Sequence, residues 1–220
     1  MRFYANFRDA LNELRRDVSE LGSFVHPQTM QDKDIADDPA FLTKEYTNQI
    51  FTVTRPVLDD LRPTQPWADA EFKERLGFET EGTAWKLRPE VWTEFHDRGF
   101  GYTYGERYGR SLPGILTELE SHPDSRQLFL SVWSPERDAG VLGRRRVPCS
   151  LGYWFNLRHG ELGITYLQRS ADITTHFEND IYLTHSLQRY VAHCIGARVG
   201  HYTHWIGSLH AYAKDVAGSF

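Results

Sequence analysis

The pattern of residues between positions 151 and 209 constrains the fold most strongly. Two runs with strand character, 151–157 and 162–168, flank the turn Arg158-His159-Gly160-Glu161, and this arrangement predicts a β-hairpin. Apolar residues at helical spacing then predict a helix over 180–195, and a last strand is expected over 199–209. Strands and a helix without regular βαβ alternation favour an α+β fold, a mixed sheet packed with helices.

The rest of the chain gives weaker signals. Helical spacing followed by Gly22 predicts a helix over 7–21. Weak strand character covers 24–35, whereas 39–53 fits a helix or a strand equally well. A short helix over 112–119 and a strand over 128–133 are also expected.

A charged segment over 56–98 contains Trp67, Trp85 and Trp92. Its apolar residues recur neither at the period of 2 of a strand nor at the period of 3.6 of a helix. We expect short peripheral helices there. The tryptophans are interpreted as packing anchors, and the alternative is a wall that faces a ligand.

Composition narrows the class of protein. No Gly/Ser-rich or Pro-rich linker divides the 220 residues, of which 40% are hydrophobic, so we expect one domain spanning 1–220. A net charge of -5 argues against a broad nucleic-acid surface. Because the sequence has no 18-residue apolar run and no signal-like start, we expect a soluble, cytoplasmic protein with no membrane partner.

The two cysteines, Cys149 and Cys194, are too few for a disulfide framework. Cys149 is a candidate nucleophile, because a thiolate is favoured by positive charge and Arg169 with Ser170 could form an anion site beside it. Cys194 falls on the apolar face of the helix over 180–195 and is assigned to the core. The run Arg144-Arg145-Arg146 is interpreted as a solvated turn.

Two other kinds of site are disfavoured. His201, His204 and His210 lack the spacing of a zinc motif and any accompanying cysteine pair, so no metal is expected. The glycine-rich run over 99–109 lacks the Gly-Lys-Ser/Thr ending of a phosphate-binding loop.

Several motifs together resemble the thymidylate synthase superfamily over roughly 102–212. Pro148-Cys149 resembles its nucleophile motif, Gln168-Arg169-Ser170-Ala171-Asp172 its Q-R-S-x-D motif, and Pro123-Asp124-Ser125-Arg126 its phosphate-binding turn. The resemblance implies a thymidylate synthase-like fold in which one sheet face forms a homodimer interface.

The base preferred by the site is suggested by Asp180. Synthases that act on deoxyuridylate carry asparagine at this place, and Phe177-Glu178-Asn179-Asp180 resembles the deoxycytidylate hydroxymethylases of phages. Ser208 in Gly207-Ser208-Leu209-His210 supports the same branch. A carboxylate accepts a hydrogen bond from the N4 amino group of cytosine, whereas an amide complements uracil.

The resemblance also implies roles for individual residues. Cys149 would add to C6 of the pyrimidine of dCMP or CMP, whose C5 would attack the one-carbon unit of 5,10-methylenetetrahydrofolate, and water would complete a 5-hydroxymethyl group. Further roles are implied for Arg169, Ser170 and the partner subunit's Arg126 (phosphate), His210 and Tyr212 (sugar), Tyr104 (proton transfer at C5) and Asp172 (the pterin ring).

Departures from the family pattern keep alternatives open. Gln127 replaces a second phosphate-binding arginine. The family's catalytic glutamate is expected within 45–53, where comparison with the family pattern places Gln49 or Ile50, and Glu45 is a candidate for its role. Eight residues follow Tyr212, whereas family members continue and use that tail to close over folate. A dUMP methylase, or a nucleotide-binding protein or enzyme that does not use folate, is therefore retained beside the hydroxymethylase.

Overall fold

The computed structural model describes residues 1–30, 33–77, 82–97, 99–109, 111–139 and 146–216. Its α-helices are α1 (Phe7–Leu21), α2 (Trp67–Arg75), α3 (Pro89–Asp97), α4 (Tyr104–Tyr108), α5 (Leu112–Ser121), α6 (Pro135–Asp138), α7 (Phe177–Cys194) and α8 (Ala213–Val216). Three short 3-10 helices are η1 (Pro39–Phe41), η2 (Leu58–Asp60) and η3 (Ala84–Leu87). The strands are β1 (Arg2–Tyr4), β2 (Ser23–Val25), β3 (Thr29–Met30), β4 (Lys33–Asp34), β5 (Thr43–Val53), β6 (Phe129–Ser131), β7 (Ser150–Arg158), β8 (Glu161–Asp172) and β9 (Arg198–Tyr212).

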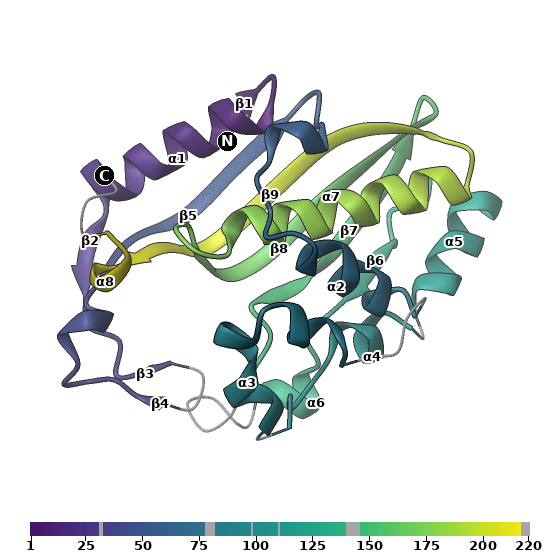
Figure 1. The fold of residues 1–220 in the computed structure, drawn as a ribbon. Helices are drawn as coiled ribbons and strands as arrows, with labels where there is room; N and C mark the ends of the chain where they lie inside the picture. The colour runs from purple at the N-terminus through teal and green to yellow at the C-terminus, as the bar shows by residue number, and fades with distance from the viewer. Residues whose placement is uncertain (31–32, 78–81, 98, 110, 140–145, 217–220) are drawn as a thin grey trace.

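A mixed sheet with the order β1-β5-β9-β8-β7-β6 organises the molecule, and β2 pairs with the end of β5. The β7–β8 pair is antiparallel, whereas β8 and β9 are parallel and connected through α7. Helices α1 and α7 contact this sheet and lie across it on the same side (Figure 1). This arrangement confirms the predicted α+β class.

Local sequence explains the clearest elements. The predicted hairpin turn is present, with His159 and Gly160 both at positive φ, 53° and 73°, as a tight hairpin turn requires. Asn6 caps α1 by accepting a hydrogen bond from the Asp9 amide at 2.9 Å. The predictions of a helix over 7–21 and of strands β7, β8 and β9 are therefore confirmed.

Two predictions are resolved or corrected. The ambiguous segment 39–53 is a strand, β5, preceded only by the turn η1, because its β-branched and aromatic residues pair with β9 along most of their length. Cys194 is exposed rather than in the core. The buried stripe of α7 ends at Val191 and Ala192, so the last turn of the helix lies outside the packed region.

The core beneath α7 contains a row of stacked rings. Tyr153 stacks on Tyr166 with centroids 4.9 Å apart, and Tyr166 stacks on His204 at 4.4 Å. Phe177, the first residue of α7, stacks on His204 at 5.4 Å. Tyr153, Tyr166 and His204 lie on one face of β7, β8 and β9, and the polar residues described next continue that face beyond α7. Among the described residues, no helix has the length and apolar character needed to cross a membrane.

Candidate active site

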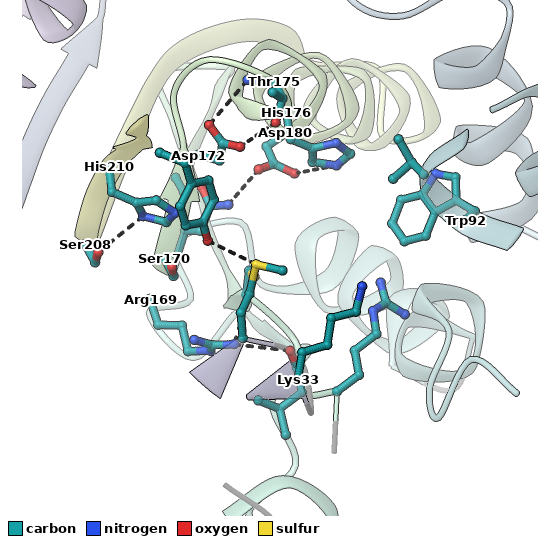
Figure 2. A pocket seen from close by; sticks show the side chains of 18 of the residues that line it. Lys33, Trp92, Arg169, Ser170, Asp172, Thr175, His176, Asp180, Ser208 and His210 are labelled. Atoms are coloured by element: carbon teal, nitrogen blue, oxygen red, sulfur yellow. Dashed lines mark hydrogen bonds and ion pairs between the residues drawn. The ribbon is translucent and has the colours of Figure 1, made fainter. Parts of the chain in front are cut away.

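A cavity of about 790 Å³ lies over the ends of β8 and β9. Its floor continues the sheet face that α7 covers, because side chains two residues apart on a strand share a face. The floor residues are Gln168, Ser170 and Asp172 of β8, Ser208, His210 and Tyr212 of β9, and Glu45 of β5. Figure 2 shows Ser170, Asp172, Ser208 and His210 gathered on this side of the cavity.

Cys149 stands immediately before β7 and lines the cavity. Arg169 Nη2 lies 4.0 Å from its Sγ atom, and Arg169 is fixed by donating to the carbonyl oxygens of Pro148, at 2.8 Å, and Val147, at 3.2 Å. Burial raises the pKa of the Cys149 thiol, and the Arg169 guanidinium opposes that rise. The predicted pairing of a cysteine with a cation is thus present in the structure.

Asp180 lies in the first turn of α7 and faces the same cavity. Gln168 Nε2 donates to Asp180 Oδ2 at 2.7 Å, and Gln168 Oε1 contacts His204 Nε2 at 2.9 Å. Because the Gln168 amide nitrogen donates to Asp180, its oxygen accepts from His204. Burial raises the pKa of the Asp180 carboxyl. Asp180, the residue predicted to select the base, is therefore held in place by a hydrogen bond from Gln168 of the sheet.

Tyr104 of α4 lines the cavity, and its hydroxyl begins a chain of hydroxyl groups that leads into the core. Its hydroxyl lies 2.9 Å from Ser150 Oγ, which lies 2.5 Å from the Tyr166 hydroxyl. Burial raises the pKa of Tyr104 well above its ordinary value, so the group is a neutral hydroxyl at ordinary pH. The chain therefore fixes the Tyr104 hydroxyl from the core side.

His210, Tyr212 and Glu45 lie close together, as strand register requires. Glu45 is paired with His210 across β5 and β9, and Ser208 Oγ donates a hydrogen bond to Glu45 Oε1. Tyr212 donates to Met30 Sδ of β3 at 3.3 Å. Burial lowers the pKa of His210, which favours its neutral form.

Two of the predicted site residues, Asp172 and Arg126, do not lie among the other site residues in the same way: Asp172 is hydrogen-bonded to a turn and Arg126 is outside the cavity. The Asp172 carboxylate accepts from the Thr174 amide at 3.0 Å and the Thr174 hydroxyl at 2.6 Å, so it orders the turn before α7 while lining the cavity. Arg126 is exposed and lies outside the cavity lining. Its carbonyl oxygen accepts from Trp154 Nε1 at 3.3 Å.

Sequence reasoning missed several residues of the opposite wall. The guanidinium carbon of Arg75 lies 3.6 Å from the centre of the Tyr104 ring, and Arg75 Nε donates to Glu71 Oε1 at 2.8 Å. Arg146, expected in a solvated turn, instead lines the cavity with its guanidinium 4.6 Å from the centre of the Tyr102 ring. Arg144 and Arg145 lie outside the described residues. Arg75 and Glu71 carry no local motif that could have identified them.

The tryptophans have features of both a packing anchor and a wall that faces a ligand. Trp67 is buried and stacks on Trp92 with centroids 6.0 Å apart, which is the packing role. Trp67, Trp85 and Trp92 also line the cavity. The indole N–H groups of Trp67 and Trp85 are buried and have no hydrogen-bond partner among the described residues.

The histidines considered for a metal are dispersed. His201 is exposed, His204 is in the core, and His210 is on the cavity floor. Within the part of the chain that the structure describes, no group of three acidic, histidine or cysteine side chains is arranged to hold a metal ion.

A cysteine beside an arginine, across a cavity from a buried carboxylate, defines a site for nucleophilic chemistry on a small anionic ligand. Comparison with known proteins specifies the family, because the thymidylate synthase family model matches residues 72–218. The chain therefore belongs to the thymidylate synthase family.

Individual relatives support this membership. The chain is 28% identical over 172 residues to the "Putative thymidylate synthase" of Methanocaldococcus jannaschii, covering 77% of this chain and 76% of that protein. It is 28% identical over 145 residues to the thymidylate synthase of Bacillus atrophaeus, covering 60% and 62% respectively. The solved thermostable thymidylate synthase A of Bacillus subtilis has the same fold, with a TM-score of 0.76 at 21% identity over 96% of this chain and 82% of that one.

The family gives the general activity. The protein is a thymidylate synthase-like enzyme of nucleotide metabolism, in a family of one-carbon transferases that use methylenetetrahydrofolate as cosubstrate. Members of this family bind a nucleotide and are usually dimeric.

Proposed function

We propose that the protein is a pyrimidine nucleotide 5-hydroxymethylase that acts on dCMP or CMP. The observation that carries this proposal is the Asp180 carboxylate, which lines the cavity that contains Cys149 and is fixed by Gln168 at 2.7 Å. A carboxylate oxygen accepts from the N4 amino group of cytosine, whereas it meets the O4 atom of uracil as a second acceptor. The charge and position of Asp180 therefore favour the amino-bearing base.

The proposed reaction begins at sulfur. The Cys149 thiolate forms a bond to C6, and the electron pair of the C5–C6 double bond moves to C5. Arg169, 4.0 Å from the sulfur, favours the thiolate that this step requires. Arg169 and Ser170 also lie where they can bind the phosphate, and His210 and Tyr212 where they can bind the sugar.

The remaining steps form the product and release the enzyme. Methylenetetrahydrofolate would supply a one-carbon unit at the oxidation level of formaldehyde, which becomes bonded to C5 while its bond to the folate nitrogen breaks and tetrahydrofolate leaves. The proton that leaves C5 would pass to water in the cavity, and the Tyr104 hydroxyl, held by Ser150 at 2.9 Å, would assist by hydrogen-bonding that water. Water then adds to the resulting exocyclic methylene, the C5–C6 double bond forms again, and the Cys149 thiolate leaves.

The cavity fits a second ligand as well as a nucleotide. Its volume of about 790 Å³ lies toward the upper end of the range of small-molecule sites. Trp67, Trp85 and Trp92 line the cavity and provide flat aromatic surface on which a ring can stack. In this proposal the tryptophan wall and Asp172 hold the pterin ring.

We also propose a homodimer formed through the sheet face opposite α1 and α7. Trp154, Thr165, Leu167 and Trp205 alternate with core residues along β7, β8 and β9, and they are only half-buried. Half-buried aromatic and aliphatic residues on adjacent strands are typical of a face that packs against a second sheet. In such a dimer the exposed Arg126 would serve the partner's phosphate site. Size-exclusion chromatography with light scattering tests this arrangement.

The activity test uses dCMP and CMP labelled with tritium at C5, with formaldehyde and tetrahydrofolate. We expect tritium release together with a product heavier by one CH2O unit, as measured by mass spectrometry. If neither nucleotide releases tritium, the proposal is wrong.

A dUMP methylase is the second candidate, because the relatives reported above are described as thymidylate synthases. It predicts that dUMP rather than dCMP releases tritium and that dihydrofolate absorbance appears. A third version, which binds the nucleotide without folate chemistry, predicts binding of CMP or dCMP by calorimetry and no ternary complex with folate.

A further inference from the structure

His176, the residue before α7, lies next to Asp180 in the cavity lining (Figure 2). Its Nε2 atom is 3.6 Å from Asp180 Oδ1, which is longer than a hydrogen bond but close enough for a strong electrostatic interaction. The sequence analysis assigned no role to this residue. The inference below rests on the proposed function and concerns how the site selects its base.

The tautomer of His176 follows from Arg88. An Arg88 guanidinium nitrogen, Nη1, lies 3.1 Å from His176 Nδ1, and a guanidinium can only donate. Nδ1 is therefore the acceptor, and the ring proton is on Nε2, facing Asp180. Burial lowers the pKa of His176, and the positive charge of Arg88 acts in the same direction. The imidazole is consequently neutral and presents one N–H to the carboxylate.

Asp180 thus has a donor at each oxygen. Gln168 donates to Oδ2 at 2.7 Å, and the His176 N–H faces Oδ1 at 3.6 Å. Donors at both oxygens favour the ionised carboxylate, which can only accept hydrogen bonds.

The protonation state of Asp180 matters for selectivity. A protonated Asp180 would carry an O–H donor beside a carbonyl acceptor, which is the same pattern as an amide. That pattern can satisfy the O4 and N3–H groups of a uracil ring, so an acid at this position would discriminate poorly.

We propose that His176 is a specificity-determining residue: with Gln168, it holds Asp180 as an acceptor, so that the cavity prefers a 4-amino over a 4-oxo pyrimidine nucleotide. It acts through Asp180 and is a positioning residue. Arg88 supports it by fixing the ring proton on the nitrogen that faces the carboxylate.

Other charged groups around Asp180 set the background for this effect. Burial has the largest effect and raises the pKa of Asp180, Asp172 of β8 raises it further, and Arg75 of α2 lowers it together with Gln168 and His176. The negative charge of Asp180 in turn raises the pKa of Cys149, in addition to the larger effect of burial. Trp67 and Trp92 pack on the His176 ring with centroids 5.5 and 6.1 Å away, which keeps the imidazole in place.

The test compares His176→Leu, which removes the N–H, with His176→Gln, whose amide can accept from Arg88 and donate toward Asp180. Calorimetry would give the Kd values of dCMP, CMP, dUMP and UMP for wild-type protein and both variants. The ratio of the uridylate Kd to the cytidylate Kd is measured on the folded fraction alone. We expect His176→Leu to reduce this ratio by about threefold, the lower end of the range for one net hydrogen bond, because the 3.6 Å contact is electrostatic, with the larger loss at acidic pH. His176→Gln should retain most of it.

The outcomes separate this inference from the function on which it rests. A wild-type protein that does not prefer cytidylates would overturn the proposed function. A wild-type preference that His176→Leu leaves unchanged, or that His176→Gln loses equally, would overturn the role of His176 alone.

Discussion

Replacing Asp180 by asparagine tests the central feature of the site, and the structure predicts which way the new amide faces. Gln168 accepts from His204 through its oxygen, so toward residue 180 it can only donate. The asparagine oxygen is therefore expected at the place of Oδ2, and its NH2 group at the place of Oδ1, near His176. A donor would then stand where the carboxylate accepts.

The expected change in binding follows from the groups exchanged. A cytidylate loses a hydrogen bond to a charged acceptor, which contributes about 1.5–3 kcal/mol, or roughly a 10- to 150-fold increase in Kd. A uridylate gains a donor for O4, so its Kd should fall. The proximity of the new NH2 group to the His176 N–H, two donors facing each other, limits that gain.

Calorimetry with dCMP and dUMP measures both effects, and Asp180→Ala serves as the control that removes acceptor and donor together. The control should weaken dCMP binding without improving dUMP binding. A dCMP Kd that changes by less than about twofold in Asp180→Asn, below what one net hydrogen bond contributes, would refute the assignment of Asp180 to the base.

Three further predictions concern the nucleophile, its pH dependence and the core. Cys149→Ala should abolish tritium release while leaving the hydrodynamic size unchanged, and a variant that still released tritium would exclude a sulfur adduct. Because burial raises the pKa of Cys149 and Arg169 opposes the rise, kcat/KM should increase with pH as the thiolate forms; Arg169→Gln should move this increase to higher pH, and an unmoved profile would mean that Arg169 does not act on the thiol. Leu187→Ala, in a fully buried position of α7 (0% exposed), should lower the free energy of unfolding by about 2–5 kcal/mol in urea denaturation. Leu21→Ala, at 58% exposure, is the matched control that should change little, and equal losses would contradict the assignment of the core.

Much of the fold was predictable from local patterns. The hairpin turn at His159 and Gly160 and the apolar stripe of α7 depend on neighbours in sequence, and both predictions are confirmed. The segment 39–53 could not be decided, because its pairing with β9 joins residues 149 to 169 positions apart. Cys194 was misassigned, because periodicity does not show where a helix passes the edge of its sheet.

The site was predictable only where its residues belong to a compact motif. Cys149, Arg169 and Asp180 were selected from short motifs, and the structure brings them to one cavity. Arg88 and His176 are 88 positions apart, and their contact arises only when the segment before α3 folds against the start of α7. Roles that depend on such distant pairs carry no signal in a single sequence.

The link from Gln168 to His204 has a consequence for engineering the enzyme. His204 is sandwiched between Tyr166 and Phe177 in the interior, so the orientation of the carboxylate that we propose to read the base depends on aromatic residues outside the cavity lining. A mutant library that varies only residues lining the cavity would leave the aromatic residues around His204 unchanged. Selections for altered base preference should therefore also return substitutions in the aromatic interior.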